Sequence, residues 1–135
     1  MPLSGRPYHG PFVALPRALS LWLPVVLWAG LIFALSSIPD LGTGLGGWDL
    51  VLRKTAHAAE FAVLGLLLAR ALGRELPALL LGIAYAATDE LHQAVVPGRH
   101  GSLWDVLLDS VGVALGILLL RRFRGVTWRA RRNAV

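Results

Sequence analysis

A polar stretch in the second half of an otherwise apolar chain carries most of the residues that could do chemistry. Between Thr88 and Asp109 it holds carboxylates, imidazoles, an amide and a guanidinium, namely Asp89, Glu90, His92, Gln93, Arg99, His100, Ser102, Asp105 and Asp109. A second polar group, Lys54, His57 and Glu60, lies upstream. Histidines beside carboxylates suit acid–base chemistry or metal binding, and Arg with Lys suits a phosphate. The chain has no cysteine, which excludes disulfides, thiolate chemistry and Cys-type zinc sites.

The composition is that of a membrane protein. Hydrophobic residues make up 56% of the 135 residues and charged residues 16%, whereas soluble domains average about 45–50% and 25%. The mean hydropathy is +0.63. The net charge of +5 would suggest nucleic acid in a soluble protein, but here it comes from arginines near the C-terminus. Such a cluster beyond a membrane helix is typical of a topology signal that rests on anionic lipid, so we expect no nucleic-acid partner.

Four apolar segments predict an all-α integral membrane four-helix bundle, forming one domain over residues 18–120. Each segment is near the ~20 residues that cross a bilayer. We expect a disordered N-terminal tail over 1–17, a Gly-rich loop over 41–48 and a basic cytoplasmic tail over 121–135. Gly73 is expected to end the second helix, and Pro97–Gly98 to form a tight turn. The expected helices are about 18–38, 50–72, 77–96 and 102–120.

The first apolar segment has an alternative interpretation as a cleaved signal peptide. The sequence Ala34-Leu35-Ser36 resembles a small-residue cleavage site. The apolar run is longer than a typical signal-peptide core and follows a long tail, so we favour a retained spanning helix. Pro24 is expected near the start of this helix, where its missing N–H costs least.

The distribution of Lys and Arg predicts the orientation. Only Arg53, Lys54 and Arg99 would lie on one side of the membrane, and the other ten on the opposite side. The positive-inside rule then predicts up-down topology with cytoplasmic N and C termini. All intramembrane charges fall at the outer end, with Glu60, Asp89 and Asp109 about 10 Å inside. We therefore expect an outward-facing polar pocket between the second, third and fourth helices, above a tightly packed inner half where Gly112 and Gly116 permit close helix contact.

The expected pocket suits several kinds of chemistry. Three cations face five carboxylates, so with neutral histidines its formal charge is −2. Such an excess favours a retained proton, a protonated histidine or a bound divalent cation, although no tight metal motif such as HExxH is present. The catalytic candidates are His57, His92, Asp89, Glu90 and Asp105; the ligand or phosphate-binding candidates are Lys54, Arg99, Gln93 and Ser102; Glu60 and Asp109 complete the pocket.

Structural interpretations stand beside these functional ones. A closed salt-bridge network would pin three helices without any ligand, making the protein a non-catalytic scaffold. Ser102 could cap the fourth helix, with Asp105 completing a capping box, and His100 could simply be solvated in its loop. Trp48 and Trp104 are typical interfacial anchors. An ion-coupled transporter is a weaker alternative, because four short helices show no internal repeat.

The joined motifs resemble the VanZ-like family of small bacterial membrane proteins over roughly Ser36 to Gly116. The motifs are Lys54-Thr-Ala-His57-Ala-Ala-Glu60-Phe61, Asp89-Glu90-Leu91-His92-Gln93, Pro97-Gly98-Arg99 and Ser102-x-x-Asp105 with Gly112. The resemblance implies a multi-pass protein of the bacterial cytoplasmic (inner) membrane, related to an accessory protein of teicoplanin resistance. With the Arg99–Lys54 pair it suggests binding, or modification, of an envelope lipid, wall precursor or glycopeptide. The family often has Asn where this chain has Asp109, an additional carboxylate.

Overall fold

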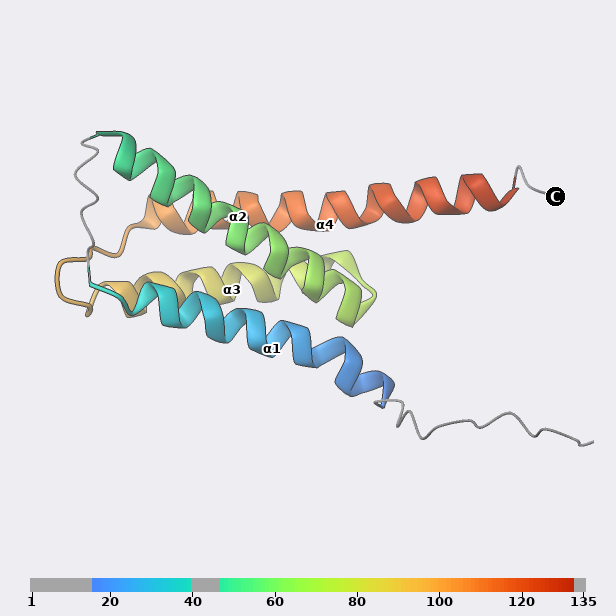
Figure 1. The fold of residues 1–135 in the computed structure, drawn as a ribbon, viewed down its shortest axis with the longest axis horizontal. Helices are drawn as coiled ribbons and strands as arrows, with labels where there is room; N and C mark the ends of the chain where they lie inside the picture. Colours follow the sequence, from blue (N-terminus) through green and yellow to red (C-terminus); the bar gives the residue numbers. More distant parts are fainter. Residues whose placement is uncertain (1–15, 40–46, 133–135) are drawn as a thin grey trace, which may run out of the picture.

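Four α-helices make up the part of the chain that the structure describes. This computed structural model describes residues 16–39 and 47–132, with side chains as far as residue 125. The expected all-helical architecture with four helices is confirmed. Residues 1–15 of the expected tail and 41–46 of the expected loop lie outside the described residues, whereas Arg17 and Gly47–Trp48, expected in the tail and the loop, are helical. The helices are α1 (Arg17–Ser36), α2 (Gly47–Leu72), α3 (Glu75–Gln93) and α4 (Leu103–Arg132) (Figure 1).

Several helix ends differ from the prediction. The fourth helix continues to Arg132 instead of ending near Leu120, and it projects beyond the other helices in Figure 1. The basic segment has no proline and is rich in arginine, a good helix former, so the helix continues through Gly125 beyond the end of its apolar part. Pro24 lies inside α1 and not in its first turn. Gly73 ends α2 as expected, with a left-handed φ of 67° and its N–H donated to the Ala69 carbonyl.

The Pro-Gly turn between α3 and α4 has the expected tight geometry. Gly98 has a φ of 78°, and the Arg99 N–H donates to the Val96 carbonyl at 3.1 Å. Proline followed by a glycine with positive φ is the pattern of a type II turn. α3 itself ends at Gln93, three residues before its predicted end, because the N–H groups of Val95 and Val96 donate to carbonyls three residues back instead of four.

Helices α2 and α4 lie in close contact because glycines remove the side chains between them. A Cβ on Gly112 would meet the backbone carbonyl of Ala58, and a Cβ on Gly116 would meet that of Ala62. Gly65 on α2 faces the Val113 backbone in the same way. The expected close contact at Gly112 and Gly116 is therefore present. This contact keeps the N-terminal parts of α2 and α4 close enough for their polar residues to meet, as in the ion pair of Lys54 with Asp105.

The core lies between α2, α3 and α4, and α1 packs against α2 and α3. Phe61, Leu64 and Val113 are almost fully buried there. The outer faces carry large exposed apolar side chains on every helix, for example Leu27 at 64% and Leu115 at 57% exposed. In length and composition, α1, α2 and the Leu103–Gly125 part of α4 could each cross a membrane. The glutamate, aspartate, histidine and glutamine in the last turns of α3 make that helix less apolar.

Candidate functional site

The polar ends of the four helices meet around one cavity. α1 and α3 end there and α2 and α4 begin there, at the left of Figure 1. Its volume is about 640 Å³, which is within the ~300–1,000 Å³ of typical small-molecule sites. The residues expected in a pocket that line this cavity are Lys54, His57, Glu60, Glu90, Gln93, Arg99, Ser102, Asp105 and Asp109.

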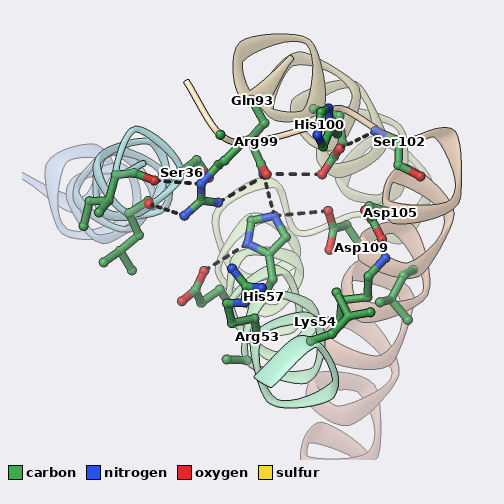
Figure 2. Close-up of a pocket in the computed structure, with 18 residues that line it drawn as sticks. Ser36, Arg53, Lys54, His57, Gln93, Arg99, His100, Ser102, Asp105 and Asp109 are labelled. Atoms are coloured by element: carbon green, nitrogen blue, oxygen red, sulfur yellow. Dashed lines mark hydrogen bonds and ion pairs between the residues drawn. The ribbon is translucent and has the colours of Figure 1, made fainter. Parts of the chain in front are cut away.

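His57 on α2 is the centre of the polar contacts (Figure 2). Its Nδ1 lies 3.3 Å from Glu60 Oε2, one turn along the same helix. Its Nε2 lies 3.2 Å from Asp89 Oδ2 on α3 and 3.4 Å from Asp109 Oδ2 on α4. The edge of the ring contacts Phe61, with the ring centroids 5.1 Å apart. One imidazole therefore joins carboxylates from three helices.

Asp89 lies below the cavity and not in its lining. It is only 2% exposed. Its Oδ2 accepts hydrogen bonds from Ser36 Oγ at 2.8 Å and from Gln93 Nε2 at 2.9 Å. Sequence reasoning missed Ser36. Its only signal in the sequence was its position at the C-terminal end of the first helix, the end expected to lie level with the charged groups of the other three helices. The contact gives α1 a direct polar connection to the site.

Asp109 on α4 is the most deeply buried carboxylate of the site, at 0% exposed. Among the described residues, neither of its oxygens has a hydrogen-bond partner, and the same is true of Asp89 Oδ1. The 3.4 Å approach of His57 Nε2 is its contact with a positively chargeable group. Burying a carboxylate without hydrogen bonds is costly, so this residue requires a specific explanation.

Arg99 connects the turn after α3 to the end of α1. Its Nε donates to the Ile38 carbonyl at 2.7 Å and its Nη2 to the Leu35 carbonyl at 3.1 Å. Its Nη1 donates to Gln93 Oε1 at 3.3 Å. The last carbonyls of a helix lack intrahelical partners and favour a nearby cation. Arg99, which was predicted to bind phosphate, therefore also holds the end of α1 in place. Figure 2 shows its guanidinium group beside α1.

The start of α4 is capped by the preceding helix. Glu90 Oε2 accepts the backbone N–H of Ser102 at 2.8 Å. The Ser102 carbonyl accepts the N–H groups of Asp105 and Val106, which places Ser102 at the N-cap position through its backbone. The expected capping box with Asp105 is wrong, because Glu90 takes the amide of Ser102 and Asp105 is instead paired with Lys54. The Lys54–Asp105 ion pair joins α2 to α4.

His92 lies outside the cavity, on the side of α3 that faces α1. Its ring stacks on Phe33 with the centroids 4.2 Å apart, and its Nε2 lies 2.9 Å from Ser37 Oγ. The neighbouring Gln93 faces the cavity instead. One residue is a rotation of about 100° on a helix, so adjacent positions can serve different partners. The structure therefore leaves His57 as the histidine at the centre of the site.

Charge and polarity vary across the cavity. The side chains of Arg53 and Lys54 at the rim are 43% and 41% exposed, and each is paired with a carboxylate. The floor is acidic and buried, with Glu90 at 5% exposed and Asp109 at 0%. Apolar side chains from three helices complete the wall, namely Leu35, Ile38, Leu50 and Leu108. Sequence reasoning missed this apolar wall, because lipid-facing and cavity-facing apolar residues look alike in a sequence; Arg53 was counted in the expected charge of the pocket but not among its ligand-binding candidates.

A metal ion is one group that this donor set could hold. His57, Asp89 and Glu90 each offer a ligand atom, and these three atoms lie within 4.8 Å of one another. Nitrogen and carboxylate ligands in such a cluster suit zinc or a similar divalent ion. The same side chains could also exchange protons with a bound molecule, since His57, Glu60 and Glu90 line the cavity.

The fold and site define the class of protein as a small helical membrane protein with a polar cavity at one end of its bundle. The chain matches the family model described as VanZ/LLP1 over residues 11–124 and belongs to this VanZ family. The expected family is therefore confirmed. No curated protein and no solved structure gave a significant match to the chain.

Proposed function

We propose that all four helices cross the bacterial cytoplasmic membrane, with both termini cytoplasmic and the cavity open to the outside. The ten-to-three asymmetry of Lys and Arg supports this orientation. The 19 residues of α3 extend about 28 Å at ~1.5 Å per residue, close to the ~30 Å hydrocarbon core. Because α3 packs against both α2 and α4, it would cross together with them.

The absence of cysteine makes this topology directly testable, since any introduced cysteine is unique. His100→Cys lies at the cavity, and Arg74→Cys lies in the connection at the other end of the bundle. A membrane-impermeant maleimide added to intact cells should label His100→Cys and should label Arg74→Cys only after the cells are opened. The reverse pattern would overturn the proposed orientation.

We propose further that the cavity binds an anionic amphiphile of the cell envelope, a phosphate-bearing lipid or a lipid-linked wall precursor. The observation that carries this proposal is the meeting of half-exposed rim cations with an apolar wall in one cavity at the polar end of the bundle. Lys54 and Arg53 would contact the phosphate, and Leu50 and Leu108 would contact the adjoining chain. Lys54 has three donors, so pairing with Asp105 leaves it able to bind an anion as well. Arg99 would mainly position the end of α1.

A catalytic version of this proposal assigns acid–base chemistry to His57. Its ring lines the cavity and is oriented by Glu60 through Nδ1, an arrangement typical of a general acid or base. Asp89 and Glu90 would tune the charge of the ring, and Asp105 would hold Lys54 in place. His92 is not part of this version, because it packs against α1.

The test compares two lipids that differ only by the phosphate. Purified protein in detergent is titrated with a polyprenyl phosphate or with the corresponding polyprenol, and bound lipid is measured by native mass spectrometry. We expect the phosphate form to bind more tightly, and Lys54→Gln to weaken it by about 5–10-fold through the loss of a half-exposed charged hydrogen bond. Arg70→Gln, an exposed residue on the same helix but at the opposite end, is the matched control. Equal binding of both lipids, or equal effects of both variants, would rule the proposal out.

A purely structural role is the second candidate. The observation favouring it is that the cations of the site already have protein partners: Lys54 has Asp105, and Arg99 has the carbonyls of α1. In a scaffold, Lys54→Gln would lower stability and the lipid phosphate would make no difference to binding. Thermal unfolding measured beside the lipid titration separates these outcomes.

Family membership adds glycopeptide resistance as a cellular role for the same cavity. Cells that express the wild type at levels matched to Lys54→Gln should then tolerate more teicoplanin than cells that express the variant. Equal susceptibility would argue against a part for the cavity in resistance, while leaving the lipid test to decide on binding.

A further inference from the structure

The floor of the cavity contains more buried negative charge than its protein contacts satisfy. Asp109 is completely buried with neither oxygen hydrogen-bonded within the described residues, and Asp89 Oδ1 is in the same condition. Lys54 is the only lysine in the chain, and its ammonium group is paired with Asp105 at the rim of the cavity. Buried carboxylates persist when they are paired, protonated or bound to a cation. The unpartnered oxygens therefore point to a ligand of positive charge.

The contacts around His57 are compatible with a tautomer that leaves Nε2 able to bind a cation. Arg99 donates to Gln93 Oε1, which fixes the orientation of this amide. The Gln93 Nε2 group then faces His57 Nε2 at 3.3 Å, Asp89 Oδ2 at 2.9 Å and Glu90 Oε1 at 3.4 Å. Gln93 Nε2 has two hydrogens for these three acceptors; when one of them points at His57 Nε2, that nitrogen carries the lone pair and Nδ1 carries the proton. That Nδ1 proton is directed at Glu60.

A lone pair on His57 Nε2 would face carboxylate oxygens at 3.2 Å (Asp89) and 3.4 Å (Asp109). A lone pair and two carboxylates at such separations repel one another, and a bound cation among them would remove this repulsion. For the two proposed ligands His57 and Asp89, the 3.2 Å separation matches the ~3.3 Å edge of a tetrahedron with bonds of ~2.0 Å, the geometry of zinc. Glu90 belongs to the same cluster, since its ligand atom lies within 4.8 Å of those of His57 and Asp89.

Each candidate ligand also has an outer partner that would hold it in place. Glu60 contacts the far nitrogen of His57, forming the carboxylate–histidine arrangement common at metal sites. Ser36 donates to Asp89, and the Ser102 amide donates to Glu90. These contacts orient the ligands while leaving Asp89 Oδ1 and both Asp109 oxygens unpartnered within the described residues.

We propose that the cavity floor binds one divalent metal ion, with zinc as the reference ion, through His57 Nε2, Asp89 and Glu90, beside the counter-charge of Asp109. His57, Glu90 and Asp109 all line the cavity, so the ion can enter from it. A metal here would face any molecule that enters and would attract oxygen ligands such as phosphate. The metal site does not depend on the proposed lipid. Its ligands are an imidazole and carboxylates of the cavity floor, whereas the lipid phosphate would contact the cations at the rim.

The test measures zinc binding to the full chain in detergent, without lipid and with any affinity tag removed. Chelator-treated protein is titrated with zinc against a chromophoric competitor. We expect one zinc per chain, with affinity reduced about 10–100-fold in Glu60→Gln, which removes an outer partner, and at least as much in Asp89→Asn. Asp105→Asn is the matched control, since it removes a carboxylate of the same cavity that Lys54 already holds; its affinity should stay within about fivefold of the wild type.

Two results would overturn the metal site. One is wild-type zinc binding no stronger than that of Asp89→Asn; the other is an equal loss in Asp105→Asn and Asp89→Asn. Should Asp89→Asn fail to fold, X-ray absorption of the zinc-loaded wild type decides. One imidazole with oxygen ligands at ~2.0 Å supports the site, and two or more imidazoles would assign the zinc to other histidines. Retained zinc binding in Lys54→Gln with loss of lipid binding would separate this site from the proposed function.

Discussion

The close contact between α2 and α4 predicts a stability difference between two alanine substitutions that look alike in the sequence. A Cβ at Gly116 would collide with the backbone carbonyl of Ala62 and approach the backbone nitrogen of Leu66. Both are main-chain atoms, so no side chain can move aside and the helices themselves must separate. At Gly30 on α1, by contrast, an added Cβ has nothing within 4 Å.

The two substitutions share the same intrinsic gain. Replacing glycine by alanine inside a helix contributes about 0.5–1 kcal/mol in favour of the helix. Overpacking a tight contact costs about 1–3 kcal/mol. Gly30→Ala should therefore be neutral or stabilising, whereas Gly116→Ala should be less stable than Gly30→Ala by the overpacking cost, about 1–3 kcal/mol.

The assay is reversible unfolding of the detergent-solubilised protein by increasing SDS, followed by circular dichroism or tryptophan fluorescence. The comparison of the two variants cancels most of the shared helix propensity. If Gly116→Ala unfolds at the same SDS fraction as Gly30→Ala, or at a higher one, the close backbone contact of α2 and α4 does not exist as described.

The polar contacts of α1 give two further predictions in the same assay. Ser36→Ala removes the hydroxyl that donates to buried Asp89 and should cost about 1.5–3 kcal/mol; Ser20→Ala, which loses only an exposed local bond, should change stability by less than about 0.5 kcal/mol. Equal effects would contradict the role of Ser36. Arg99→Lys should cost about 1–3 kcal/mol, because an ammonium cannot reproduce the three directed bonds of the guanidinium. Arg53→Lys is its control, because the half-exposed Arg53 pairs with Asp49 one turn away and lysine keeps this charge; it should cost about 0–1 kcal/mol. If Arg99→Lys were as stable as the wild type, the proposed connection of Arg99 to α1 would be contradicted.

The helices and the gathering of charges at one end could be predicted because they depend on local sequence. Apolar runs of spanning length predict helices, and alternating direction brings the start of α2, the end of α3 and the start of α4 to the same level. The contact at Gly112 and Gly116 followed from spacing alone. The end of α4 did not, because apolarity marks where a bilayer would end, whereas the helix continues through helix-forming arginines to Arg132.

The contacts that could not be predicted, those of His92, Arg99 and Ser36, all depend on where α1 lies beside the other helices. His92 and Gln93 are adjacent on α3, and the packing of Phe33 against His92 decides which of them faces the cavity. Arg99 donates to α1 carbonyls because the Pro-Gly turn happens to lie beside the end of that helix. No spacing within a sequence gives this lateral placement. Ser36 was missed for the same reason, since its partner Asp89 is on another helix.

The central claim is that a phosphate-bearing amphiphile occupies the cavity, and protection of a cavity cysteine tests it most directly. The rate of maleimide labelling of His100→Cys is measured in detergent with added polyprenyl phosphate or polyprenol, and Arg74→Cys serves as the control at the other end of the bundle. We predict that the phosphate lipid slows labelling of His100→Cys several-fold, that polyprenol does so much less, and that Arg74→Cys is unaffected. Labelling of His100→Cys at the same rate with both lipids, at concentrations where native mass spectrometry detects bound lipid, would contradict the account.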